Sequence, residues 1–429
     1  MTRLKIIIAT KIRSPRLDYI LDWVFGEQFD LDWAFAKEGE TSHVSYGDSI
    51  INDSFFIPAS AILSDEGIFE GSPEIGITQN LTIIFPAEGD VPFDIFGAIF
   101  FMLSRMEEYQ PFTPDKHGRF SAAESLAFKK GFLERPVVDE WLQFFRQKLN
   151  SKFPELNIKS PEYSFHSTLD IDRAFLFKYK SFPRFVGGVL KAFFKGRFAE
   201  VVNRKWSYFG LIKDPNDTFL KLADIHEKHK IRPKVFFLTG NPGVFDENLP
   251  LSHKSLQKVI FETSHWGDVC WHPSYGIGEN LEKLLDEKRK FEKFIGKPVT
   301  EVRRHFLKIS IPTTYRNFEK LSIKKDHSLA FADMPGFRAG TSLPFPFFDV
   351  ENSKILDVTV YPFALMDTTF TTYLNQGPEE CLEKVSVIIS NVKKVGGRME
   401  ILWHNETLNN LGPWKGWGDV LEQIIKMGK

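Results

Sequence analysis

The chain has little of what marks secreted, membrane-spanning or nucleic-acid-binding proteins. Its 429 residues include only two cysteines, Cys270 and Cys381, which excludes a disulfide framework and a zinc site built from cysteines. It has no apolar run of about eighteen residues, so no membrane-spanning helix is predicted. With 55 basic and 56 acidic residues the net charge is -1, which argues against general nucleic-acid binding.

No signal peptide is predicted at the amino terminus. The apolar run in its first ten residues is too short for a signal peptide, and it predicts a first strand. Together with the scarcity of cysteine, this makes the cytoplasm the expected compartment. Phenylalanine, by contrast, is abundant, with 43 residues, and we interpret this as aromatic packing in a globular protein.

The chain is longer than one hydrophobic core usually needs, so two domains are expected. Residues 1–155 are predicted to form a smaller α/β domain with an amphipathic helix at Leu17–Phe25 and an apolar helix at Phe93–Leu103, and we assign it no chemistry. The polar, proline-containing stretch Asn150–Pro161 is typical of a linker. A second domain is expected at residues 163–429.

In the second domain, strand and helix patterns alternate. Strands are predicted to end near Asp170, Gly240, His272 and His404, with short ones at Val302–Leu307 and Ser328–Ala332 and helices at Glu279–Phe294 and Pro378–Lys394. Such alternation is typical of a parallel sheet with covering helices, open or closed into a barrel. In these sheets the carboxyl ends of the strands carry the chemistry.

Acidic and imidazole groups follow several of these strands. Asp170 and Asp172 share one face of a strand, and two adjacent carboxylates call for a cation between them or a raised pKa of one. A metal ligand beside a general base is the economical interpretation, and two acids in an exposed turn are the alternative. His272 is a candidate nitrogen ligand, or else a core histidine, and His404 is a candidate proton donor because imidazole titrates near neutral pH.

These motifs resemble those of the polysaccharide deacetylases with NodB homology, carbohydrate esterase family four. The resemblance is to a bacterial branch with a His-Pro-Ser-Tyr second motif and an additional uncharacterised domain in front. The matching segments are Thr168–Asp172, His272–Tyr275, Arg303–Leu307 and Leu402–Asn405, with Asp326, or alternatively Asp333, as the remaining match. The resemblance implies a deformed (β/α)7 barrel and the metal-dependent removal of an acyl group, usually N-acetyl, from a sugar.

The resemblance also implies a role for individual residues. Asp170 is expected to be the base, and Arg303 to orient it. His404 is expected to donate a proton and Asp326 to tune it. The candidate ligands of a divalent metal, zinc in the first place, are Asp172, His272 and His305.

His305 is included because the second motif departs from the family pattern. The usual second histidine, four residues after His272, is Gly276 here. His305 follows the arginine of the third motif and is the expected replacement, with Ser274 or a water as alternatives.

Further side chains are expected to contact the substrate. They are Tyr275, Arg338, Trp403 and Trp417. Arg338 lies in the small-residue loop Gly336–Ser342, which could hold a sugar hydroxyl, carboxylate or phosphate, or could be a tight turn. The tryptophans offer flat faces to sugar rings, although tryptophan is more often a core residue. Tyr361–Asp367 ends an apolar segment in another aspartate and is expected to shape the pocket.

A basic aromatic insert occupies residues 177–208. Between positions 178 and 206, eight residues are lysine or arginine and only Glu200 is acidic, with phenylalanines between them. Such a segment could contact an anionic membrane peripherally or bind an anionic glycan lipid. The alternative is a helix pair that packs on the barrel and exposes its lysines.

The expected function is that of a metal-dependent, deacetylase-like hydrolase that removes an N-acetyl or O-acetyl group from a sugar or glycolipid in surface polysaccharide assembly. A catalytically weak relative that binds glycan or scaffolds a complex remains open because of Gly276. A third interpretation is a glycosyltransferase whose two aspartates hold a metal and a nucleotide sugar. It gives His272, Arg303 and His404 no joint role.

Overall fold

The computed structural model describes residues 4–51, 53–64 and 67–429. The chain forms two compact units, each assembled from separate stretches. The first unit contains Met1–Ser164, Lys308–Ala364 and Val387–Met399, and the second contains Phe165–Leu307, Leu365–Ser386 and Glu400–Lys429. The two-domain division expected near residues 155–163 stays a prediction.

The first unit begins with a small parallel sheet. Its strand order is β2 (Asp32–Phe35), β1 (Lys5–Ala9), β3 (Val44–Gly47), β4 (Phe55–Pro58), and all three pairings are parallel. β1 lies where the first strand is predicted, and residues 1–3 of that segment lie outside the described part of the chain. Ile6 and Ile8 of β1 are fully buried, as alternation along a strand with one covered face requires.

Helices and short strands complete the first unit. The helices are α1 (Pro15–Leu21), α2 (Ile95–Leu103), α3 (Leu126–Lys129), α4 (Val137–Lys152) and α10 (Thr313–Lys320). The strands are the antiparallel pair β5 (Ile75–Thr78) and β6 (Leu81–Ile84), and β13 (Lys354–Val360) with β12 (Phe345–Asp349) antiparallel and β11 (Lys325–Asp326) parallel to it. α2 is the predicted apolar helix. Every residue of it is buried, and the Asp94 carboxylate caps its first turn by accepting from the Gly97 amide.

The second unit contains part of the larger sheet, and this part is parallel. Its strand order is β10 (Glu301–Val302), β9 (Asp268–His272), β8 (Lys234–Leu238), β7 (Ser164–Ile171), β15 (Arg398–His404), β14 (Leu365–Met366). The described pairings β10–β9, β9–β8, β8–β7 and β15–β14 are all parallel. The Thr168 hydroxyl donates to the Ile401 carbonyl at 2.6 Å, which ties β7 to β15.

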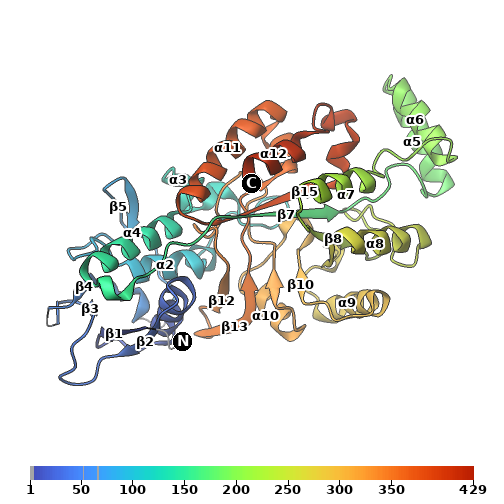
Figure 1. Cartoon of the computed structure of the whole chain (residues 1–429). Coiled ribbons are helices and arrows are strands. Elements are labelled where there is room, and N and C mark those ends of the chain that lie inside the picture. Colours follow the sequence, from blue (N-terminus) through green and yellow to red (C-terminus); the bar gives the residue numbers. More distant parts are fainter. Residues whose placement is uncertain (1–3, 52, 65–66) are drawn as a thin grey trace. The chain divides into compact units, whose positions relative to one another are not determined.

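Helices alternate with these strands in the chain, and one more follows the last strand. They are α5 (Phe182–Phe194), α6 (Phe198–Tyr208), α7 (Phe219–Lys228), α8 (Lys254–Trp266), α9 (Leu281–Ile295), α11 (Pro378–Lys394) and α12 (Val420–Gly428). α7 and α8 pack side by side near β7 and β8 (Figure 1). Among the described helices, none combines the length and the apolar character needed to cross a bilayer.

The fold is thus an α/β protein with a small amino-terminal parallel sheet and a larger, mostly parallel one. Closure of the larger sheet into a (β/α)7 barrel stays a prediction. The strand predicted at Val302–Leu307 is wrong beyond Val302, because Phe306 and Leu307 adopt left-handed φ angles of 61° and 53° that end a strand. The strand predicted at Ser328–Ala332 is also wrong, and β11 ends just before it.

Candidate metal centre and active site

The candidate side chains of the second unit lie at the carboxyl ends of neighbouring parallel strands. Asp170 is the second-to-last residue of β7, and Asp172 directly follows that strand. His272 ends β9 and His404 ends β15. Because parallel strands point the same way, these ends meet at one edge of the sheet.

Asp170 is held by a buried guanidinium. Its Oδ1 accepts a hydrogen bond from Nη1 of Arg303 at 2.9 Å. Arg303 has no exposed surface, and its Nη2 lies 3.3 Å from Oε1 of the equally buried Glu400. Its guanidinium also lies over the Phe236 ring, 4.4 Å from the centroid. These contacts give Asp170 a fixed orientation.

Asp172 faces three imidazoles. Its Oδ1 lies 3.1 Å from Nε2 of His272, and its Oδ2 lies 3.3 Å from Nε2 of His305 and 3.6 Å from Nε2 of His404. Two triads therefore have ligand atoms within 4.8 Å of one another, Asp172 with His272 and His305, and Asp172 with Asp170 and His404. The structure thus brings together all three predicted metal ligands, the predicted base and the predicted proton donor.

The outer nitrogen of each imidazole has a partner of its own. Nδ1 of His272 lies 2.5 Å from the Arg303 carbonyl oxygen, and since a carbonyl only accepts, this Nδ1 carries a proton. The other partners are Asp246 Oδ1, 2.9 Å from Nδ1 of His305, and Asp367 Oδ1, 2.6 Å from Nδ1 of His404. The three Nε2 atoms consequently face Asp172, the arrangement in which histidines bind metals.

Two atoms at the centre of this group have no hydrogen-bond partner among the described residues. They are Nε2 of His272 and Oδ1 of Asp172, both buried. They lie 3.1 Å apart, and no other described group forms a hydrogen bond with either of them. A divalent cation satisfies both, and nitrogen and carboxylate donors are those that zinc accepts. The donor set fits such an ion.

Charge shifts the protonation of the same groups. Burial alone would lower the pKa of His305, but the charges of Asp172 and Asp246 and their hydrogen bonds raise it to about 9. Burial likewise opposes protonation of His404, yet Asp367, followed by Asp172 and Asp170, raises its pKa to about 10. Burial would raise the pKa of Asp172, but the neighbouring imidazoles hold it well below the ordinary value. His404 therefore holds a proton on Nε2 at neutral pH.

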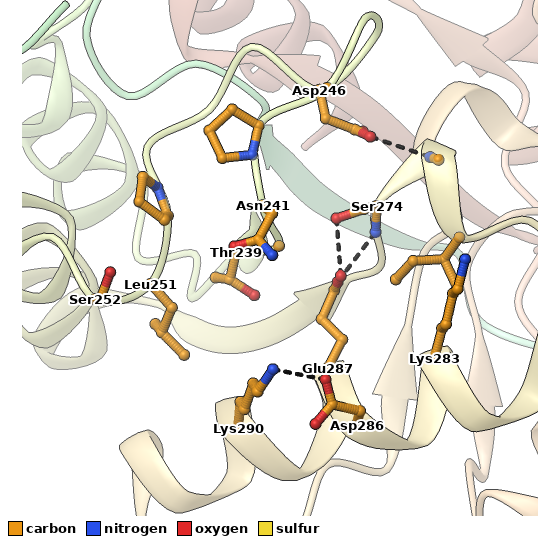
Figure 2. A pocket seen from close by; sticks show the side chains of 16 residues that line it. Thr239, Asn241, Asp246, Leu251, Ser252, Ser274, Lys283, Asp286, Glu287 and Lys290 are labelled. Carbon is orange, nitrogen blue, oxygen red and sulfur yellow. Dashed lines mark hydrogen bonds and ion pairs between the residues drawn. The ribbon is translucent and has the colours of Figure 1, made fainter. Parts of the chain in front are cut away.

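A cavity of about 560 Å³ opens beside this cluster at the ends of β8 and β9 (Figure 2). Asp246 belongs to both, because it lines the cavity and contacts His305. The buried Glu287 accepts from the Ser274 amide at 3.0 Å and from its hydroxyl at 2.8 Å. The hydroxyl of Thr239 is buried and has no partner within the described chain. The cavity thus offers hydroxyl and carboxylate groups to a polar ligand.

The predicted substrate residues of the second unit differ in exposure. Tyr275 is half-buried, with its ring 4.7 Å from that of Phe245 and 5.2 Å from that of Phe306. Trp403 and Trp417 are 0% and 1% exposed, and their ring centroids are 6.1 Å apart. Both tryptophans are core residues without an open face for a sugar.

Arg338 and Asp326, which belong to the first unit, are both buried. Nη2 of Arg338 lies 2.6 Å from Oε2 of Glu108, so its charge is already paired. Asp326 accepts from the Tyr315 hydroxyl at 3.1 Å and from the Ser328 amide at 3.1 Å. The acid in contact with His404 is Asp367, which was not predicted, and the tuning role of Asp326 stays a prediction.

Three acids that contact the candidate residues were not predicted from the sequence as site residues. Asp367 directly follows β14, so it has the same strand-end signal as Asp170, but we predicted only a pocket-shaping segment there. Glu400 is a charged residue inside the apolar strand β15, which is itself a signal of a buried ion pair. Asp246 lies in an irregular loop after β8, where no periodicity could indicate its direction.

One family model matches the amino-terminal part of the chain. Residues 6–154 match the model of DUF7033, described as a family of unknown function. No curated protein matches the chain. The family description names no activity for the amino-terminal part.

Solved structures show distant similarity. One is described as a polysaccharide deacetylase from Mycobacterium smegmatis, with a TM-score of 0.41, 12% identity, and coverage of 62% of this chain and 84% of that one. Another is described as a glycoside hydrolase/deacetylase from Parabacteroides distasonis, with a TM-score of 0.37, 12% identity, and coverage of 63% and 67%. At 12% identity and TM-scores of 0.41 and 0.37, the similarity does not assign a function to this chain.

Proposed function

We propose that the second unit is a metal-dependent hydrolase that removes an acetyl group from a sugar. The observation that carries the proposal is the meeting of two aspartates and three imidazoles, with Nε2 of His272 and Oδ1 of Asp172 buried and unpartnered in the described chain. The motifs that resemble the deacetylases supply the same residues. N-acetyl is the expected group, with O-acetyl as the alternative.

Asp172, His272 and His305 would hold a divalent cation, zinc in the first place. When bound, such an ion supplies Lewis acidity, which polarises the acyl carbonyl and makes water a stronger acid. His305 would coordinate through Nε2 after losing the proton there. Its Nδ1 would keep its proton and donate a hydrogen bond to Asp246. In this scheme His305 takes the position that Gly276 leaves without a ligand.

Proton transfer falls to the remaining two residues. Asp170 accepts the proton of the attacking water at Oδ2, because its Oδ1 is bonded to Arg303. His404 donates its Nε2 proton to the departing nitrogen or oxygen as the bond to the acyl carbon breaks. Asp367 stabilises the imidazolium and fixes the ring through Nδ1.

The cavity beside the cluster would receive the sugar. Its volume of about 560 Å³ is within the usual range for ligand sites, which is roughly 300–1,000 Å³. Thr239, Ser274 and Asp246 line it, and Asp246 joins this surface to the proposed metal ligands. An acetylated sugar or glycolipid is therefore the proposed substrate class.

The proposal is tested with the purified full-length protein by metal analysis and by acetate release from a panel of acetylated amino sugars. We expect bound divalent metal and acetate release. Asp170→Asn should lower kcat by at least about a hundredfold, the usual loss for a general base, and leave the metal bound. His272→Gln should lose both metal and turnover.

Asp224→Asn is the matched control, since this acid is exposed and lies within α7, not at the end of a strand. It should retain metal and rate. Glycan binding without turnover would favour a binding or scaffolding protein instead. Binding of a nucleotide sugar that requires Asp172 would favour a glycosyltransferase.

A further inference from the structure

A helical hairpin, formed by α5 and α6 and called here the basic hairpin, extends from the second unit. In Figure 1 it stands apart from α7, α8 and α9. The two helices pack on each other and are joined by a turn at Gly196, whose φ is 68°. The hairpin takes no part in the candidate active site.

The inner faces of the two helices fit closely. The rings of Phe185 and Tyr208 stack with centroids 4.0 Å apart. A Cβ atom on Gly188 would lie 2.4 Å from Nη1 of Arg204, so a larger residue there would displace this side chain. Phe185 and Ala192 are buried at 7% and 3% exposure. Each helix thus has one face that is already covered.

The base of the hairpin is held by one buried acid. Asp214 accepts from the amides of Leu176, Phe177 and Lys178, with distances of 2.7–2.9 Å. It also accepts from the Ser207 hydroxyl at 3.0 Å. The start of the insert and the end of α6 are therefore fixed to the same point, which sets the direction in which the hairpin extends.

The outer faces are apolar and exposed. Along α6 and its end, Phe198, Val202, Trp206 and Phe209 follow at intervals of four, four and three residues, which places them on one helix face. Their exposures are 62%, 40%, 51% and 65%. The exposed apolar residues of α5 are Phe182, Leu190, Phe193 and Phe194, at 64%, 50%, 54% and 81%. A contiguous exposed apolar surface of this kind marks an interaction site.

Positive charge surrounds that surface. The exposed basic residues are Arg184, Lys191, Lys195, Arg197 and Lys205. Glu200, the one acid between positions 178 and 206, is paired with Arg204 at 2.9 Å. The hairpin is therefore strongly basic, whereas the whole chain has a net charge of -1. A partner for this surface has to combine negative charge with an apolar interior.

We propose that the basic hairpin docks on the surface of an anionic lipid bilayer. Its aromatic side chains enter the boundary between headgroups and acyl chains, and its lysines and arginines contact the lipid phosphates. A second copy of this chain is a poorer occupant, since two hairpins of the same charge repel each other. A nucleic acid matches the charge and leaves the apolar face uncovered. The proposal does not depend on the proposed hydrolysis.

The test measures binding of the full chain to vesicles of phosphatidylcholine, alone or mixed with phosphatidylglycerol, by co-sedimentation. We expect binding only to the anionic vesicles, weakened by salt. Lys191→Glu with Lys195→Glu should weaken binding at least about tenfold, from about fivefold for each basic charge near the surface. Phe194→Ser with Trp206→Ser should also weaken it at least about tenfold, because the inserted area is lost.

Matched controls lie on α8. Lys254→Glu with Lys258→Glu repeats the charge change at the same four-residue spacing, and Phe261→Ser removes an aromatic residue that is 65% exposed. Both should bind vesicles like the parent chain. Equal binding to neutral vesicles, or equal loss in the controls, would overturn the proposal. So would self-association that needs Phe194 and Trp206 without any vesicle binding. Acetate release measured in parallel shows whether a variant that loses vesicle binding keeps the proposed hydrolase activity.

Discussion

At the scale of the residue, Asp170 and Asp172 leave the same strand on the same face and meet different neighbours. Asp170 is bonded to a guanidinium, which has no lone pair and cannot share a cation. Asp172 faces imidazole nitrogens, whose lone pairs can bind the same cation as the carboxylate. The proposed division into base and metal ligand therefore rests on Arg303 and the histidines around the two acids.

Asp246 shows how one acid supports a ligand. Its Oδ1 contacts Nδ1 of His305 and accepts from the Tyr275 amide at 2.8 Å, and its Oδ2 accepts from the Gly276 amide at 3.1 Å. Asp246→Asn removes the charge that holds the Nδ1 proton. We expect metal affinity to fall roughly 10–100-fold, as for other lost partners of metal-binding histidines. Competition with a chromophoric chelator measures the change.

The control for that change is Asp286→Asn. Asp286 also lines the cavity but is exposed and paired with Lys290 at 2.6 Å. It should leave metal affinity unchanged. Equal affinity of the Asp246→Asn protein and the parent would show that Asp246 does not orient His305.

At the scale of the element, strand ends create the site. β9, β7 and β15 each end in a candidate group, and parallel pairing brings these ends to one edge. β10 is short, and the turn that follows it places Arg303 and His305 at the same edge. A strand continued to Leu307 would carry His305 farther along the strand direction, away from Asp172.

The contact between α7 and β7 predicts a pH dependence of stability. His226 of α7 lies 2.9 Å from the Ser167 hydroxyl of β7 and 2.7 Å from the Leu222 carbonyl oxygen, which satisfies a neutral ring. Burial lowers its pKa to about 4. The unfolded chain binds this proton below its ordinary pKa of about 6.5, so stability falls as pH drops from about 6.5 to about 4, by roughly 3 kcal/mol in all.

Urea unfolding across that pH range measures the effect. His226→Gln should be less stable at pH 7 and lose stability less steeply on acidification. His265→Gln, the same change at an exposed site on α8, should keep the parental slope. An unchanged slope in the His226→Gln protein would contradict the assignment.

At the scale of the whole molecule, a buried ion cluster supports the first unit. Glu108 pairs with Arg105 at 2.9 Å and with Arg338 at 2.6 Å, and all three side chains are at most 4% exposed. Burial would raise the pKa of Glu108, but the two guanidiniums lower it below its ordinary value. Glu108→Gln leaves two buried positive charges short of a partner, and we expect unfolding free energy to fall by about 3–5 kcal/mol.

Denaturant unfolding compares this protein with Glu319→Gln. Glu319 pairs with Lys354 at 3.0 Å, and the two side chains are 31% and 50% exposed. Solvent weakens such a pair, so the loss should stay below about 1 kcal/mol. Similar losses in the two variants would show that the buried cluster does not stabilise the unit.

Much of the site could be predicted because strand-end patterns are local. An apolar run that ends in Asp170, His272 or His404 already requires a partner for the buried group, and neighbouring parallel strands supply one. The expected role of Asp326 beside His404 stays a prediction, and the contact of His404 with Asp367 was not predicted. Spacing along the chain does not say which of several buried acids a given imidazole meets.

The sequence by itself determined the alternation of strands and helices, the acidic pair, the candidate histidines and the basic aromatic insert, because each is a pattern within a few neighbouring residues. Only the tertiary structure decided that His305 joins Asp172, that Asp246 and Asp367 hold the imidazoles, that Arg338 is paired with Glu108, and that both tryptophans are core. These contacts join residues far apart in the chain, and side-chain direction in loops and turns depends on packing that no local pattern encodes.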